Sequence, residues 1–96
     1  MLFVITCLDK PESSALRAAT RPAHLDYIRA QAGRIAIAGP LLANDGVTPV
    51  GSELVLEFPD RAAAERFAAS DPYAKAGLFE SVTIRGFRKV FPEQQS

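Results

Sequence analysis

The sequence predicts an α+β fold, because four strand-like runs are interrupted by two helical patterns in the order β, α, β, β, α, β. Two βαβ crossovers within one four-stranded antiparallel sheet describe the ferredoxin-like split βαβ arrangement, with both helices on one face. We expect residues 1–96 to form one domain, since a chain of this length encloses a single core. The strand-like runs are 1–8, 34–42, 52–58 and 79–91, and the helical patterns are 13–33 and 61–70.

The first run, Met1–Leu8, is apolar at nearly every position, which is typical of a central strand covered on both faces. Cys7 lies inside this run. We interpret it as a small buried hydrophobic residue, because no basic partner that would favour a reactive thiolate is evident nearby.

The first helical region is expected to break at Pro22. Ser13 or Ser14 can cap a short helix, and Thr20-Arg21-Pro22 resembles a second helix start, because proline is tolerated in the first turn of a helix. The apolar stripe that follows must face a core, and a glycine is expected to end it. These residues are Leu25, Ile28 and Ala32, followed by Gly33.

The run 34–42 is interrupted at Gly39-Pro40. Since proline cannot donate to a central ladder, we expect an edge strand or a bulge there, and the glycine would let a ligand or another backbone approach closely. Asn44-Asp45-Gly46 predicts a hairpin that leads into the strand 52–58. That strand alternates, with Leu54, Leu56 and Phe58 on one face.

The second helix, 61–70, is expected to begin at an Asp60 cap, and its many alanines imply close approach to the sheet. Asp71 precedes a proline, so it should end this helix and cap a short turn that Gly77 closes in the left-handed conformation. Ala63, Phe67 and Ala68 are expected to supply the buried face.

The last strand, 79–91, is too long to keep one alternation. Val82 and Ile84 share one face, the later phenylalanines share the other, and a bulge at Gly86 would explain the change. A polar tail, 92–96, follows the strand.

Both helices on one face leave the other face of the sheet bare. The first and last strands still carry apolar residues there, and such a patch on a small domain usually marks an interface. We therefore predict a homodimer in which two sheets pack together through the open sheet face.

Composition excludes several classes of function. Eleven basic and eleven acidic residues cancel, so nothing indicates a nucleic-acid partner or an anionic membrane surface. No apolar run approaches the roughly 20 residues of a membrane-spanning helix, and the absence of a signal-peptide pattern predicts a cytoplasmic protein. One histidine and scattered carboxylates give no metal-ligand spacing, and glycine-rich phosphate loops are absent, so we expect neither a metal nor a cofactor.

Our central hypothesis is that His24, the only histidine, pairs with Asp71. A carboxylate orients an imidazole and stabilises the imidazolium that forms when it takes a proton, which suits a general base. Two alternatives stay open: His24 as a hydrogen-bonded structural residue, and Asp71 as a helix cap alone. The candidate substrate-binding residues are Arg21, Gly39, Pro40 and Tyr73. For Arg21 the alternative is a surface ion pair, and for Tyr73 it is a core aromatic.

Five separated motifs run in order along nearly the whole chain. They are Arg21-Pro22-Ala23-His24-Leu25, Gly39-Pro40 after an apolar strand, Asp71-Pro72-Tyr73, Ala76-Gly77, and the closing segment 85–91. Together they resemble the YciI-like family, a branch of the dimeric α+β barrel superfamily. The resemblance implies an active site in which His24 and Asp71 pair. It also implies a hydrolase-like or dehydrochlorinase-like activity, as in a related member that acts on a chlorinated, hydroxylated aromatic. The sequence departs from close relatives at Gly86, where proline is common, and in a short loop around Asn44.

Two classes of function therefore remain. The first is a small acid/base enzyme that acts on a small cyclic or aromatic metabolite by hydrolysis or elimination. The second is a non-catalytic small-molecule-binding or structural homodimer module. Whether the protein is an enzyme stays undecided at this point.

Overall fold

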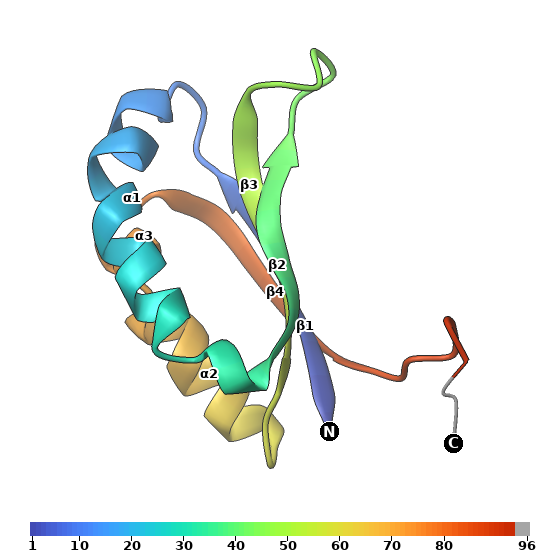
Figure 1. Ribbon diagram of the computed structural model, residues 1–96. Coiled ribbons are helices and arrows are strands. Elements are labelled where there is room, and N and C mark those ends of the chain that lie inside the picture. The colour runs from blue at the N-terminus through green and yellow to red at the C-terminus, as the bar shows by residue number, and fades with distance from the viewer. Residues whose placement is uncertain (94–96) are drawn as a thin grey trace.

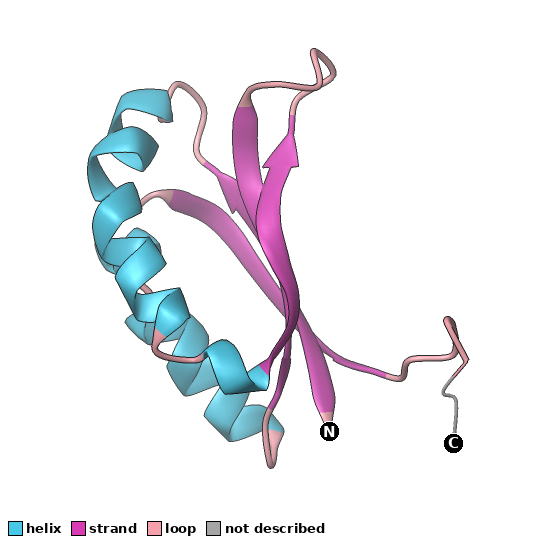
Figure 2. Ribbon diagram, in the orientation of Figure 1, coloured by secondary structure: helices cyan, strands magenta, loops and turns pink. Residues whose placement is uncertain are grey.

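The computed structural model describes residues 1–93, and the last three residues of the expected tail lie outside the described part. One antiparallel sheet has the strand order β2-β3-β1-β4, and the helices form a single layer against it (Figures 1 and 2). This is the predicted ferredoxin-like α+β fold, so the fold class is confirmed. The elements are β1 (Leu2–Asp9), α1 (Ser14–Arg29), the 3₁₀ turn η1 (Ala32–Arg34), β2 (Ile35–Leu42), β3 (Pro49–Glu57), α2 (Arg61–Ser70), α3 (Pro72–Lys75) and β4 (Phe79–Phe87).

The core lies between the sheet and the helices. Phe3, Ile5 and Cys7 of β1 are buried, and the first two pair with Leu56 and Leu54 of β3. Alternation along β3 therefore places its apolar residues toward the helices, as the sequence predicted. The remaining buried apolar residues of this core are Phe58, Ala64, Phe67 and Ala68.

Contrary to expectation, α1 is one continuous helix with Pro22 inside it. A proline within a helix removes one hydrogen bond and costs about 3 kcal/mol. Hydrogen bonds on both sides of Pro22 attach the helix to the rest of the fold and offset that cost. Before the proline, Arg17 donates to Asp9 of β1, and after it the Tyr27 hydroxyl donates to the Phe67 carbonyl of α2. The helix also ends at Arg29 rather than at Gly33, which lies inside η1.

The strand β2 is an edge strand, as predicted from its proline. An edge strand has one unpaired side and so tolerates a missing N–H. The irregularities in β2 lie between Ile35 and Ile37 and between Leu41 and Leu42, so Pro40 itself pairs regularly with Ser52.

The predicted hairpin joins β2 to β3. Gly46 takes a positive φ of 72° at its turn, and the Asp45 carboxylate accepts hydrogen bonds from the backbone N–H groups of Val47 and Thr48.

Both predicted aspartate caps are present. Asp60 accepts a hydrogen bond from the N–H of Ala63 at the start of α2, and Asp71 accepts one from the N–H of Tyr73 at the start of α3. Gly77 has the expected positive φ, 76°. One detail differs from the expected buried face, because Ala64 is fully buried where Ala63 was predicted.

The predicted bulge at Gly86 is wrong. Gly86 pairs regularly with Phe3, and the irregularity between β1 and β4 lies between Leu8 and Asp9. β4 ends at Phe87, after which the chain leaves the sheet (Figure 1). Regular alternation alone places Phe87 on the open face and Val82 and Ile84 on the helix-covered face, so the change of face needs no bulge.

The helices cover one face of the sheet only (Figure 2). The register places alternate residues of every strand on the opposite face, where Ile37 is 68% exposed. Other apolar residues on that face are Leu2, Val4, Leu8, Val55 and Phe87. No helix within residues 1–93 is long and apolar enough to cross a membrane.

Candidate functional site

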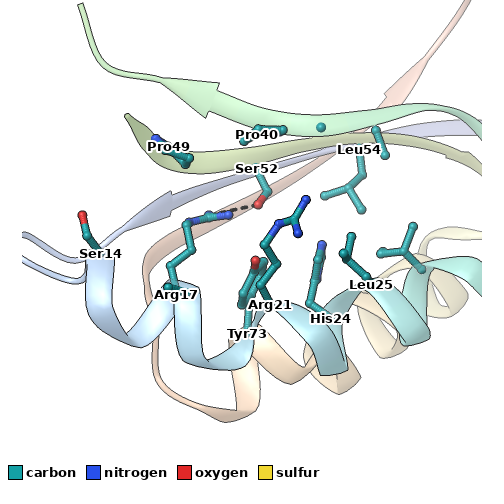
Figure 3. A pocket seen from close by; sticks show the side chains of 14 residues that line it. Ser14, Arg17, Arg21, His24, Leu25, Pro40, Pro49, Ser52, Leu54 and Tyr73 are labelled. Atoms are coloured by element: carbon teal, nitrogen blue, oxygen red, sulfur yellow. Dashed lines mark hydrogen bonds between the residues drawn. The ribbon is translucent and has the colours of Figure 1, made fainter. Parts of the chain in front are cut away.

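A cavity of about 280 Å³ lies between α1 and the β2–β3 hairpin. Figure 3 shows Arg17, Arg21 and His24 pointing from α1 toward the strands, where Ser52 and Leu54 face them. The lining consists of Ser14, Arg17, Ala18, Arg21, His24, Leu25, Ile28, Ala38, Gly39, Pro40, Pro49, Ser52, Leu54 and Tyr73.

Helical periodicity brings the polar residues of α1 to this cavity. Arg17, Arg21, His24 and Ile28 follow one another at spacings of four, three and four, which places them on one helix face. These four residues share one helix face only because α1 continues through Pro22. A break there would have separated Arg17 from His24.

His24 and Asp71 lie within hydrogen-bond distance. His24 Nδ1 is 2.8 Å from Asp71 Oδ1, and the two side chains are 12% and 4% exposed. An ionised carboxylate only accepts hydrogen bonds, so Nδ1 is the donor in this contact, and in the neutral imidazole Nε2 then holds a lone pair. His24 lines the cavity, and its ring is directed into it (Figure 3). The pair can therefore present a base to a bound molecule.

The same carboxylate oxygen also caps α3. Asp71 Oδ1 accepts the Tyr73 N–H at 2.9 Å as well as the contact from His24. One oxygen of Asp71 therefore serves both the imidazole and the helix cap. The backbone bond fixes the carboxylate, and the fixed carboxylate in turn fixes the imidazole.

Tyr73 is buried between the Arg17 and His24 side chains of α1. Its ring stacks on His24 with centroids 4.0 Å apart, and the Arg17 guanidinium lies 4.6 Å from its centroid. Burial raises the pKa of Tyr73, and the charges of Arg17 and Arg21 oppose that rise. Only 2% exposed, Tyr73 acts as a core aromatic that also forms part of the cavity wall.

Arg17 is the residue that sequence reasoning missed. Its Nε and Nη2 donate to the two oxygens of Asp9 at 2.7 and 2.8 Å, and Nη2 also donates to Ser52 Oγ at 3.1 Å. Burial lowers the pKa of Arg17, but the hydrogen bonds to Asp9, the charge of Asp9 and the interaction with Tyr73 together outweigh burial, so the pKa is raised. The available signal was its position two turns before His24, which the expected break at Pro22 concealed.

The remaining predicted residues also line the cavity. Arg21 reaches into it from α1, and Gly39 and Pro40 lie on the β2 wall (Figure 3). A Cβ on Gly39 would meet no atom within 4 Å, so close approach of a backbone does not require glycine there.

Cys7 is confirmed as buried, with 2% exposure. Burial, and after it the charge of Asp71, raise the pKa of its thiol to about 12. A thiol that stays protonated is a poor nucleophile, so Cys7 does not offer a nucleophile to this site.

Comparison with known proteins places these features in a family. The model of the YCII-related domain matches residues 1–88. "Protein YciI" of Escherichia coli O6:H1 is 40% identical over 98 residues, which cover 95% of this chain and all of that protein. An uncharacterized protein of Haemophilus influenzae is 37% identical over the same coverage.

Solved structures agree with the fold. The 5-chloro-2-hydroxyhydroquinone dehydrochlorinase of Burkholderia phenoliruptrix, in complex with 2,5-dihydroxybenzoquinone, has a TM-score of 0.85 and 30% identity, covering 92% of this chain and 94% of that one. SnoaB, a cofactor-independent oxygenase of Streptomyces nogalater, has a TM-score of 0.61 and 16% identity, covering 96% and 97%. These likenesses support the predicted fold of the dimeric α+β barrel superfamily.

Proposed function

The chain belongs to the YCII-related domain family, and from that premise we propose that it is a small acid/base enzyme acting on a cyclic or aromatic metabolite. His24 is the base and Asp71 its orienting partner, and the reaction is a hydrolysis or an elimination. The observation that carries the proposal is the 2.8 Å contact between the two side chains at the wall of a cavity.

The geometry supports proton transfer at His24 Nε2. Asp71 holds the hydrogen on Nδ1 and stabilises the imidazolium once Nε2 has taken a proton. In an elimination, the substrate loses that proton to Nε2 and a leaving group such as chloride departs with its bonding electrons. The imidazolium then returns the proton to water. Such a base contributes about 10²- to 10⁴-fold to a rate.

The distribution of apolar and polar residues around the cavity supports a small ring as substrate. Leu25, Leu54 and Ile28 give it apolar surface, while the polar groups of α1 lie along one side. The named substrate of the Burkholderia phenoliruptrix relative is a chlorinated, hydroxylated ring, which also has an apolar ring face and polar groups at its edge.

We also propose that two copies pair through the open sheet face. Ile37 and Phe87 are largely exposed there on an otherwise well-packed domain. Ile37→Lys should lower the mass measured by sedimentation toward that of one chain. Val47→Lys is the matched control, since Val47 is equally exposed but lies in the hairpin loop. Equal masses for both variants would contradict pairing through this face.

A non-catalytic binding module is the second candidate. The observation in its favour is that Asp71 Oδ1 also caps α3, so the aspartate has a structural reason to be present. In that case a ligand would occupy the cavity without being transformed.

Chloride release from 5-chloro-2-hydroxyhydroquinone tests the enzyme proposal. Wild type should release chloride, and His24→Ala should lower kcat/KM by about 10²- to 10⁴-fold with an unchanged unfolding temperature. A wild type that releases none, together with a His24→Ala variant destabilised by about 1–3 kcal/mol, would favour the second candidate.

A further inference from the structure

We infer that Arg17 binds an oxyanion of the ligand, so that the cavity selects planar rings that carry an acidic hydroxyl group. This inference rests on the proposed function, because it assigns the substrate class of the same cavity. Arg17 is a specificity-determining residue in this account, distinct from the His24 base.

The guanidinium has donors to spare. Arg17 uses Nε and both hydrogens of Nη2 on Asp9 and Ser52. Among residues 1–93 the Tyr73 hydroxyl is the other polar group that meets this guanidinium, so at least one hydrogen of Nη1 has no acceptor. The residue is only 7% exposed, yet no fully buried side-chain nitrogen in this part of the chain lacks a partner. Nη1 must therefore reach open space, and the open space that Arg17 lines is the cavity.

Arg17 is also held rigidly. Asp9 accepts two hydrogen bonds from one edge of the guanidinium in a bidentate ion pair, and the guanidinium carbon lies 4.6 Å from the centroid of the Tyr73 ring. A donor that is fixed before the ligand arrives loses little conformational freedom on binding. Its interaction with a charged oxygen is stronger than in water because Arg17 is itself only 7% exposed.

The charges at the cavity favour an anion. Among residues 1–93, two arginines and no aspartate or glutamate line it, although Asp9 and Asp71, bonded behind Arg17 and His24, offset part of the positive charge. Arg21 adds a second positive charge, but its side chain is exposed and no hydrogen bond between residues 1 and 93 fixes it.

This placement gives Arg17 a part in the chemistry. When Nε2 of His24 takes a proton from a ring carbon beside a carbonyl, the electrons of the C–H bond move onto the carbonyl oxygen, which holds them as an enolate until the C=O bond re-forms and chloride leaves with its bonding electrons. Nη1 of Arg17 then donates to that oxygen and stabilises its negative charge. Arg17 and His24 lie two turns apart on α1, and the Tyr73 ring contacts both. A ring lying along α1 can therefore meet both groups.

Binding of two probes tests the inference. 2,5-Dihydroxybenzoquinone has acidic hydroxyl groups, whereas 2,5-dimethoxy-1,4-benzoquinone has the same ring and none. Wild type should bind the first at least 10-fold more tightly by calorimetry. Arg17→Lys keeps a charge beside Asp9 but lacks the Nη1 donors, so it should weaken binding of the first probe by about 10- to 100-fold and leave the second unchanged. Arg29→Gln, on the same helix but outside the cavity lining, should change either affinity by less than 5-fold.

Two further measurements separate the possible failures. If Arg17→Lys does not fold, the Arg17 side-chain nitrogen resonances of wild type should still shift on adding dihydroxybenzoquinone. A wild type that binds both probes equally or neither, an Arg17→Lys variant that keeps the preference, or unshifted resonances would each overturn the inference. If the preference for dihydroxybenzoquinone depends on Arg17 while His24→Ala keeps full turnover, the inference about the oxyanion site is supported and the proposal that His24 is the base is wrong.

Discussion

The two long helices cover the same face of the sheet but meet it in different ways. α2 turns small residues inward, and Ala64 is 0% exposed against the strands. α1 turns Arg17, Arg21 and His24 inward, and a cavity of about 280 Å³ separates it from β2 and β3. Alanine lets a helix approach closely, whereas long polar side chains hold it away from the sheet.

The two helices therefore contribute to different properties of the molecule. α2 packs into the core and contributes stability, while α1 carries the site and is attached at two points. Arg17 ties it to β1 through Asp9, and the Tyr27 hydroxyl donates to the backbone carbonyl of Phe67 at 2.7 Å. Side chains that could have filled the core instead line a cavity, so activity and stability should respond to different substitutions.

The largest effect should come from separating the two duties of Asp71. Asp71→Ser keeps a good helix cap but is too short to reach His24, so we expect chloride release to fall by about 10²-fold or more. Asp60→Ser is the matched control, because Asp60 caps α2 through the N–H of Ala63. Nitrogen NMR should show that His24 loses its fixed Nδ1–H form in Asp71→Ser only. Equal turnover in the two variants would remove Asp71 from the chemistry.

A pair of alanine enlargements tests the contrast between the helices directly. Ala64→Leu overfills a packed site and should lower the free energy of unfolding by about 1–3 kcal/mol. Ala18→Leu extends into the cavity and should change it by less than about 0.5 kcal/mol while abolishing binding of dihydroxybenzoquinone. Denaturant unfolding and calorimetry measure the two outcomes. Similar stability losses would mean that α1 packs like α2.

A smaller effect is expected where α1 is tied to α2. Tyr27→Phe keeps the ring, which stacks on Phe67 with centroids 5.0 Å apart, and removes only the hydroxyl. The free energy of unfolding should fall by about 0.5–1.5 kcal/mol in denaturant titrations. No loss would mean that Arg17 alone attaches α1 to the rest of the fold.

The smallest effect concerns the hairpin that forms the opposite wall of the cavity. Hydrogen bonds from Thr48 and Val47 lower the pKa of Asp45 to about 2, below its value of roughly 3.9 in an unfolded chain. Because the folded-state pKa is lowered, the Asp45 charge stabilises the fold fully at pH values above the unfolded-state pKa. This stabilisation is lost as the pH falls through the folded-state pKa of about 2. The stability gap between wild type and Asp45→Asn should therefore close between about pH 4 and pH 2 in acid unfolding curves. A gap that is constant over this range would rule out a contribution from the Asp45 charge.

Part of the candidate site could be predicted from the sequence. The aspartate before proline and the lone histidine marked two of its residues, and the motif resemblance linked them. The catalytic roles of His24 and Asp71 remain predictions, although the structure brings their side chains to 2.8 Å. Arg17 could not be found, because its importance depends on Asp9, Ser52 and Tyr73, which lie on three other elements.

The sequence by itself determined the order of elements, the aspartate caps, the hairpin turn and the edge position of β2, because each follows from the local pattern of a few residues. Only the tertiary structure decided that α1 continues through Pro22, that one oxygen of Asp71 serves two partners, and that Arg17 points into a cavity. These features depend on contacts between segments far apart in the chain. The free energy of such contacts outweighs local propensity wherever the two disagree.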